Sequence, residues 1–100
     1  MLTFTHSAVI YIKVPVSALV DGVYVDPTAD VVSMAWVVPG AQPTTEWAAA
    51  TWETDPSGVR PVYLARRLST GLTAGMWTAW VRVVHGVETI ILPAGLLRVL

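Results

Sequence analysis

The segment that decides the fold is LTAGMWTAWVRVV, residues 72–84. Alternate residues from Trp77 to Val83 are apolar, so they lie on one side of an extended chain. This period of two, in a segment rich in Val and Trp, is typical of a β-strand with one face on a core. Gly75 comes just before Met76, where a loop ends. The segment therefore predicts a strand over residues 76–84.

Similar short runs, rich in Val, Ile, Trp and Tyr, lie on both sides of that strand. The stretch 46–53 is less clear: its alanines favour a helix, whereas Trp47 and Trp52 are five residues apart and align poorly on one. We expect a strand over 49–53, preceded by a turn. The other expected strands cover residues 8–16, 31–38, 59–65, 87–92 and 96–100.

Turn-forming residues separate these runs. Val84-His85-Gly86-Val87 predicts a two-residue hairpin, since Gly86 readily adopts the positive φ that primed turns need. Further turns are expected at Asp21-Gly22, Asp26-Pro27, Pro39-Gly40 and Pro93-Ala94-Gly95.

The spacing of the strands predicts the architecture. Six or seven short strands without a linker or internal repeat predict one all-β domain over residues 1–100. The spacing from Leu72 through Gly75 to Trp77 resembles the corner of immunoglobulin-like domains, where an aromatic side chain packs over the preceding turn. Many such domains have Tyr here, so its hydroxyl bond is lost or replaced by the indole N–H. We expect an immunoglobulin-like antiparallel β-sandwich of about seven short strands, with a small β-barrel as the alternative.

Composition and charge exclude several functions. Six Lys and Arg against seven Asp and Glu give a net charge of -1, and the densest basic cluster is the pair Arg66-Arg67. We therefore expect no nucleic-acid partner and no membrane partner. No apolar run reaches the roughly 18 to 20 residues of a membrane-spanning helix. The absence of cysteine excludes disulfides and thiolate metal sites.

Catalytic patterns are missing as well. His6 and His85 each lie beside a turn or a terminus, where an exposed histidine usually has no catalytic role. The segment 26–30 lacks the ligand alternation of a calcium loop and fits an Asx turn. Glu46, Glu53 and Asp55 are close in sequence, but paired-carboxylate hydrolysis needs a cleft that a small sandwich seldom provides. We expect a protein that is not an enzyme and that has no metal or cofactor.

The apolar surplus points to assembly. Hydrophobic residues make up 54% of the chain and charged residues 13%, which leaves few charges for the surface of a lone domain. The strands over 31–38 and 76–84 carry large apolar residues on both faces. Such strands belong to sheets that are covered on both sides, and a single sandwich has no third layer. We expect a neighbouring subunit to cover the second faces at Trp36, Met76 and Trp80.

Two further features bear on this interface. Trp47 is expected to contribute, because aromatic residues are enriched where a partner buries the surface. Arg66 and Arg67 are either a solvated pair or partners for carboxylates of an adjacent subunit. The alternative to assembly is carbohydrate binding on a tryptophan platform, which usually also has Asn, Gln, Asp or Arg beside the rings to recognise hydroxyl groups. The chain has no Asn and only Gln42.

Two sequence patterns are distinctive: Met34-Ala35-Trp36-Val37 and the W-x-x-A-x-W spacing from Trp47 to Trp52. With the segments 63–65, 75–83 and 95–97 they resemble small proteins encoded among the virion genes of tailed phages that infect actinobacteria. The resemblance covers about residues 14 to 100.

This resemblance implies an immunoglobulin-like virion domain without catalytic residues, encoded near genes for capsid and head-to-tail connection. The expected function is that of a non-enzymatic structural protein in several symmetric copies at the head-to-tail connector or on the capsid. Its expected partners are copies of itself and other connector, capsid or tail proteins. Its expected location is the virion, and the host cytoplasm during assembly. A tail or baseplate adaptor domain is a further alternative.

Overall fold

The computed structural model describes residues 2–70 and 72–100, and every regular element in these ranges is a β-strand. The strands are β1 Leu2–Phe4, β2 Tyr11–Val16, β3 Ala18–Val20, β4 Val23–Val25, β5 Val31–Val37, β6 Ala48–Ala49, β7 Thr51–Asp55, β8 Val62–Leu68, β9 Gly75–His85 and β10 Glu88–Val99.

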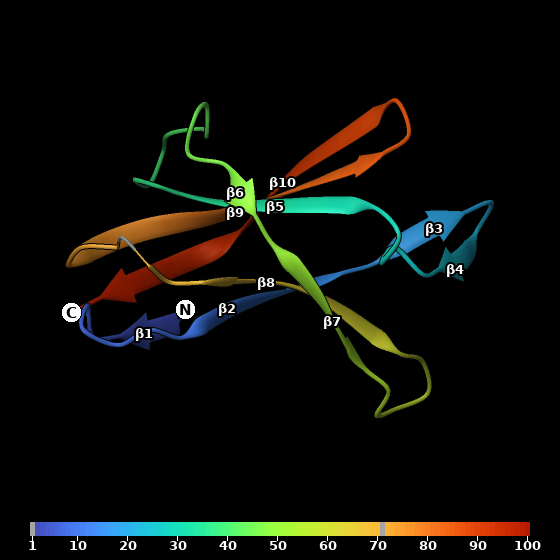
Figure 1. The fold of residues 1–100 in the computed structure, drawn as a ribbon, viewed down its shortest axis with the longest axis horizontal. Helices are drawn as coiled ribbons and strands as arrows, with labels where there is room; N and C mark the ends of the chain where they lie inside the picture. Colours follow the sequence, from blue (N-terminus) through green and yellow to red (C-terminus); the bar gives the residue numbers. More distant parts are fainter. Residues whose placement is uncertain (1, 71) are drawn as a thin grey trace.

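The strands form two sheets and a separate hairpin (Figure 1). The larger sheet has the order β1-β10-β9-β5-β6, the smaller one β2-β8-β7, and β3 pairs only with β4. Neighbouring strands are antiparallel except β1 and β10, which are parallel. Strands β5, β9 and β10 take the places of strands C, F and G of an immunoglobulin domain, and β2, β8 and β7 those of B, E and D. The all-β prediction is confirmed, and the two sheets are compatible with the predicted β-sandwich, although the described residues form ten strands where about seven were expected.

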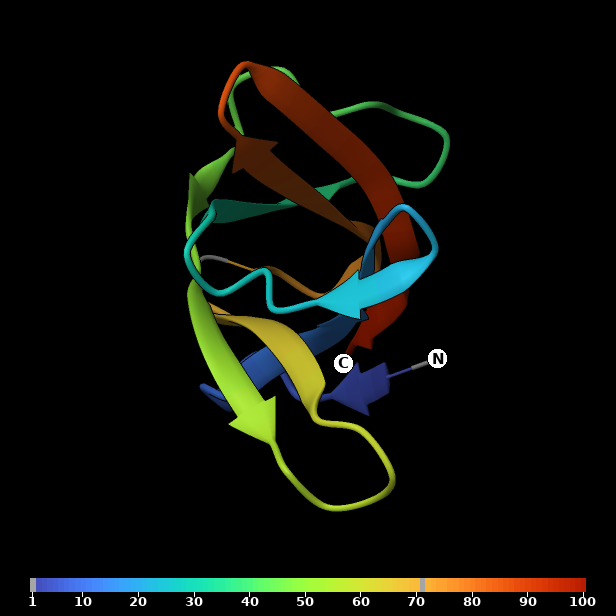
Figure 2. The ribbon, with the colours of Figure 1, turned by 90° about the vertical axis from the view of Figure 1, so that its right-hand side faces the viewer.

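The two sheets are linked along one edge. β6 pairs with β5, and after Ala50 the chain continues as β7, which pairs with β8 (Figure 2). The Ala50 N–H donates to the Val32 carbonyl at 3.0 Å where the chain leaves the first sheet. The predicted strand over 49–53 is thus present, divided between the two sheets. With one edge linked in this way, the sandwich comes close to a partly open barrel.

The core lies between the sheets and follows the predicted alternation. Trp77 packs against it, and Ala79, Val81 and Val83 of β9 are buried in it. β5 lies beside β9 in the same sheet, and its even-numbered residues face the core, because the register pairs Met34 with Val81. The other buried apolar residues of this cluster are Ile12, Val32, Trp36, Ala65, Leu72, Leu97 and Val99.

Trp77 forms the predicted corner. Its indole N–H donates to the Thr73 carbonyl at 3.0 Å, four residues upstream. A tyrosine hydroxyl makes this bond to the upstream backbone in immunoglobulin-like domains. Of the two outcomes expected for this corner, loss of the bond or its replacement by the indole N–H, the structure shows the replacement.

Three predicted boundaries were wrong. β2 begins at Tyr11 because residues 5–8 form a turn, with the Ala8 N–H bonded to the Thr5 carbonyl. β8 begins at Val62, since the turn extends to Pro61, which has no backbone N–H.

The third wrong boundary was the turn expected at Pro93-Ala94-Gly95. β10 runs unbroken through this segment, with a β-bulge where the register shifts between Pro93 and Gly95. Gly95 has a φ of 129°, which favours glycine. The bulge changes the parity of the strand, so that Ile90 and Leu92 face inward before it and Leu97 and Val99 after it.

The hairpin β3–β4 was predicted only as a turn. Asp21 and Gly22 have φ values of 50° and 78°, the pattern of a type I′ turn. Asp-Gly between apolar β-forming residues is a strong hairpin signal, and it was present in the segment 18–25.

Candidate functional site

Three arms project from one end of the sandwich, on the right of Figure 1 and toward the viewer in Figure 2. They are the hairpin β3–β4, the turn between β7 and β8, and the hairpin β9–β10. We call residues 17–31, 55–62 and 84–92 the three-armed end. The arms correspond to the B–C, D–E and F–G connections of an immunoglobulin-like sandwich.

The three-armed end carries more than half of the large apolar side chains that the described chain exposes. Isolated apolar residues on a surface are ordinary, whereas clusters of them mark interaction sites. These residues are Val23, Tyr24, Val25, Val31, Val59, Val62, Val87, Ile90, Ile91 and Leu92.

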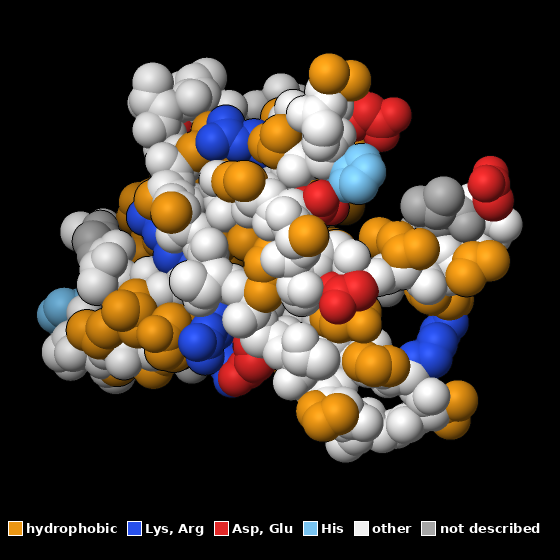
Figure 3. Space-filling model, turned by 45° about the vertical axis from the view of Figure 1, so that its right-hand side comes forward, with side chains coloured by type: hydrophobic (Ala, Val, Ile, Leu, Met, Phe, Trp, Pro, Cys, Tyr) orange, Lys and Arg blue, Asp and Glu red, His pale blue; other side chains and the backbone are white. Residues whose placement is uncertain are grey.

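This end is also acidic. Figure 3 shows acidic side chains distributed over the projecting arms. The carboxylates are Asp21, Asp26, Asp30, Asp55 and Glu88, against Arg60 as the permanent cation. A partner that binds here therefore gains from positive charge around an apolar centre.

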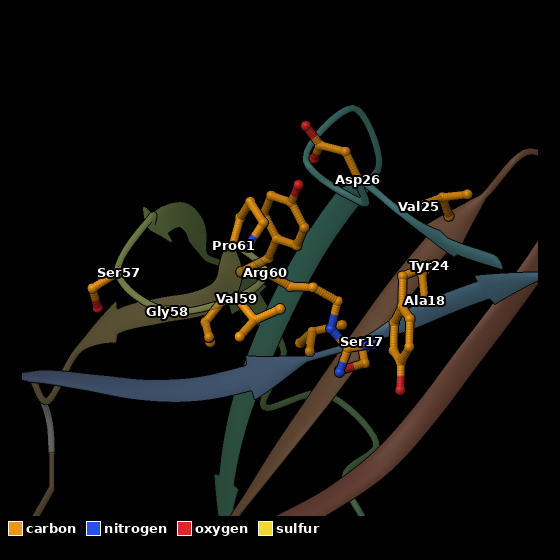
Figure 4. Close-up of a pocket in the computed structure, with 13 residues that line it drawn as sticks. Ser17, Ala18, Tyr24, Val25, Asp26, Ser57, Gly58, Val59, Arg60 and Pro61 are labelled. Atoms are coloured by element: carbon orange, nitrogen blue, oxygen red, sulfur yellow. The ribbon is translucent and has the colours of Figure 1, made fainter.

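A pocket of about 470 Å³ separates two of the arms (Figure 4). Arg60 reaches across it, and its guanidinium carbon lies 3.5 Å from the centroid of the Tyr24 ring. Tyr63, Asp26 and Ser57 also line the pocket. The Asp26 carboxylate is directed away from Tyr24 and Arg60 (Figure 4), so the hollow offers an aromatic ring and a cation to a polar ring or an aromatic side chain of a partner.

Local hydrogen bonds fix the acidic turns beside the pocket. Asp26 accepts hydrogen bonds from the Thr28 hydroxyl at 2.6 Å and the Thr28 N–H at 2.8 Å, and they hold the pKa of Asp26 below its usual value. Ser57 does the same for the pKa of Asp55. The predicted Asx turn at Asp26 is confirmed. In the described ranges, no group of three His, Asp or Glu side chains is arranged to hold a metal ion.

His85 ties the β9–β10 arm to the segment before β5. Its Nδ1 lies 2.7 Å from the Asp30 carboxylate, and this hydrogen bond raises the pKa of His85. The Asp30 carbonyl accepts a hydrogen bond from the Trp52 indole at 2.9 Å. Asp30 therefore connects the β9–β10 arm to Trp52, which packs against the core.

Trp36, a predicted interface residue, lies inside the sandwich. It is 7% exposed and belongs to the core cluster. The guanidinium carbon of Arg67 lies 4.8 Å from its ring centroid, and Arg67 donates to the Met34 carbonyl at 2.7 Å. Burial lowers the pKa of Arg67. Sequence reasoning missed this core position, although a buried Trp on strand C is a hallmark of immunoglobulin domains.

Arg66 faces the opposite side of the sheet from Arg67. It lies 3.6 Å from Glu53, donates to the Thr51 hydroxyl at 3.1 Å and stacks on Tyr11. Both arginines of the predicted pair therefore have partners within the chain. Neither needs a carboxylate from another subunit to be satisfied.

The remaining predicted interface residues lie on the outer face of the larger sheet. Trp80 is half-buried beside Ala35, its partner in the register, and Arg82 stacks on Trp47 at 4.6 Å. Ala35 is itself fully buried, so the chain covers part of this second face itself. Met76 remains exposed at the end of the sheet.

The tryptophans divide between the core and the outer face of the larger sheet. Trp36, Trp52 and Trp77 contact the core, whereas Trp47 and Trp80 lie on the outer face. They do not gather into the single stacking platform that the carbohydrate alternative assumed.

No protein-family model matches the chain, and no curated protein or solved structure is significantly similar to it. Residues 2–70 and 72–100 contain no helix that is long and apolar enough to cross a membrane.

Proposed function

We propose that the protein is a non-enzymatic structural component of a tailed-phage virion, assembled in several copies at the head-to-tail connector or on the capsid. It acts through its surface: apolar side chains on the arms are buried against other virion proteins, and acidic residues around them select the partner. Its location is then the virion, and the host cytoplasm during assembly.

The observation that carries this proposal is the excess of exposed surface. The chain exposes 6229 Å², whereas a compact monomer of its size exposes about 5,500 Å². Its radius of gyration is 14.0 Å, against about 13 Å for a compact domain of 100 residues. The arms project from the sandwich and carry more than half of the large apolar side chains that the described residues expose. A chain shaped in this way gains stability when neighbours cover the arms.

The test is to identify and locate the chain in particles. Virions of a phage that encodes it are purified, and their proteins are quantified by mass spectrometry. We expect several copies per particle, cross-linked through arm residues to connector, capsid or tail proteins. Particles that lack the chain would overturn the proposal. Cross-links to tail or baseplate proteins alone would favour the adaptor alternative.

A second candidate function, carbohydrate binding, is supported by the pocket between Tyr24 and Arg60 rather than by the tryptophans. An aromatic ring beside a cation suits a sugar with polar substituents. A glycan array separates the two functions: binding that Tyr24→Ala abolishes would favour carbohydrate recognition. Tyr11→Ala, which removes a surface tyrosine outside the pocket, is the control.

A further inference from the structure

One edge of β10 has no neighbouring strand over most of its length. β9 pairs with β10 from Glu88 to Val99, whereas the described residues of β1 pair with its other edge at residues 97–99. Along 88–96, no described strand pairs with that second edge. An open edge presents unpaired N–H and C=O groups and is a template for another strand.

The hairpin geometry shows which groups face the open edge. The two-residue turn is flanked by the pair His85–Glu88, which is a hydrogen-bonded pair in such hairpins. Hydrogen-bonded pairs then alternate along the ladder, so Thr89, Ile91 and Pro93 direct their backbone groups away from β9. Pro93 lacks an N–H, which costs no hydrogen bond on an unpaired edge.

The side chains of this stretch are suited to burial. Ile90 and Leu92 face inward but are 46% and 53% exposed, and they line a groove of about 300 Å³ beside Val14 and Val16 of β2. Ile91 is exposed on the outer face. Residues 89–97 carry no charge.

The edge strand of the other sheet is different. β2 carries Lys13 and Pro15, and both residue types protect exposed strand edges from pairing. The open stretch of β10 has no lysine, and its proline, Pro93, stands at the bulge after the uncharged run 89–92. Of these two edges, β10 is the one suited to a partner strand.

We propose that two copies of the chain associate by antiparallel pairing of their β10 edges, with Ile91 opposite the partner's Ile91. This inference deepens the proposed function, because it assigns one contact within the multi-copy assembly and rests on it. The exposed-area surplus of roughly 700 Å² over a compact monomer is close to the about 800 Å² that each partner buries in a specific interface. Pairing along this edge covers apolar side chains of the β9–β10 arm, which is one of the three arms that expose them.

The pairing satisfies the backbone groups and the side chains together. Ile91 exchanges both of its bonds with the partner's Ile91, and the Thr89 N–H donates to the carbonyl of the partner's Pro93. The missing N–H of Pro93 leaves only one bond of that pair unmade. Ile90 lies beside the partner's Leu92 on the inner face. Glu88 comes opposite the partner's Ala94, so like charges do not face each other.

The test measures the mass of the full chain in solution by size-exclusion chromatography with light scattering. Wild type is expected at twice the chain mass. Ile91→Pro removes the N–H at the centre of the pairing but leaves the ladder with β9 intact, so it is expected at the monomer mass. Ile91→Val keeps the N–H and is the matched control, expected to remain dimeric. A monomeric wild type, or an Ile91→Pro variant that stays dimeric, would overturn the proposal.

A second measurement does not depend on the variant being folded. Amide hydrogen exchange of wild type is followed at low and high protein concentration. The Thr89 and Ile91 amides are expected to gain protection as the concentration rises, whereas unchanged exchange at both would contradict the pairing. A monomer that is nevertheless present in virions would refute this contact and keep the proposed function. A dimer that is absent from virions would do the reverse.

Discussion

The two halves of β10 have similar sequences and opposite environments. Leu97 and Val99 are 4% and 2% exposed, whereas Ile90 and Leu92, which face the same side of the sheet, are about half exposed. The first pair lies where β1 covers the edge and the Trp77 corner packs below. The second lies where the sheets separate and the edge is open. Burial here depends on the neighbouring strands and not on hydrophobicity.

The largest effect is expected from truncating matched leucines of the two halves. Leu97→Ala removes a buried side chain and should cost about 2–5 kcal/mol of unfolding free energy. Leu92→Ala removes a half-exposed one, and a surface change of this kind costs roughly 0.5 kcal/mol in the monomer. Urea denaturation of both variants measures the contrast. Equal losses would show that the two halves are equally packed.

The two neighbouring arginines give the next effect. Arg67→Ala leaves the buried Met34 carbonyl without its side-chain donor and uncovers Trp36, which should cost about 1–3 kcal/mol. Arg66→Ala breaks a partly exposed ion pair with Glu53, which should cost about 0–1 kcal/mol. Denaturant unfolding ranks the two variants. A larger loss for Arg66→Ala would mean that the core does not depend on the Arg67 contact.

The stability of the end opposite the arms depends on the Trp77 corner as well. Trp77→Phe keeps an aromatic ring but removes the N–H that bonds to Thr73, so we expect a loss of about 0.5–1.5 kcal/mol. Trp77→Tyr, whose hydroxyl makes the equivalent bond in related folds, should lose less. Unfolding in urea distinguishes the two. An unchanged stability in Trp77→Phe would remove the corner from the account of this end.

The smallest effect concerns the contact between His85 and Asp30 at the three-armed end, and it depends on pH. The Asp30 carboxylate raises the pKa of His85 above its ordinary value of 6.5. A raised pKa stabilises the fold below pH 6.5, and the contribution is lost as the pH rises through the higher folded value. The melting temperature of wild type should therefore exceed that of His85→Gln at pH 5.5, with the difference vanishing at alkaline pH. A difference in melting temperature that grows with pH would contradict the contact between His85 and Asp30.

The end of the sandwich that holds the Trp77 corner could be predicted from the sequence better than the three-armed end. Alternation from Trp77 to Val83 identifies an inward face, and a Leu-Gly-aromatic spacing identifies the corner, because both signals are local. The structure of the three-armed end depends on how the three arms are oriented relative to the two sheets, which is not a local property of the sequence. Nothing near Ile90 or Leu92 in the sequence indicates that β1 stops short of them. The bulge at Ala94 was hidden because proline and glycine also mark turns.

The candidate interface residues show the same limit. Two-sided apolar strands correctly indicated that β5 is covered on both faces, and the chain itself supplies much of that cover through Trp47, Trp80 and Arg82. Trp36 was assigned to a surface because sequence periodicity does not say which of two apolar faces is the inner one. The register of β5 against β9 decides it, pairing Trp36 with Ala79.

The parallel pairing of β1 and β10 has a mechanical consequence. Both ends of the chain belong to this pair, held by Leu2–Leu97 to Phe4–Val99 and by bonds between Leu100 and both Phe4 and His6. A tension applied between the two ends pulls parallel strands in opposite directions along their length. The hydrogen bonds are then loaded together in shear and not broken one after another. Loading in shear resists separation of β1 from β10 more than loading one bond at a time would.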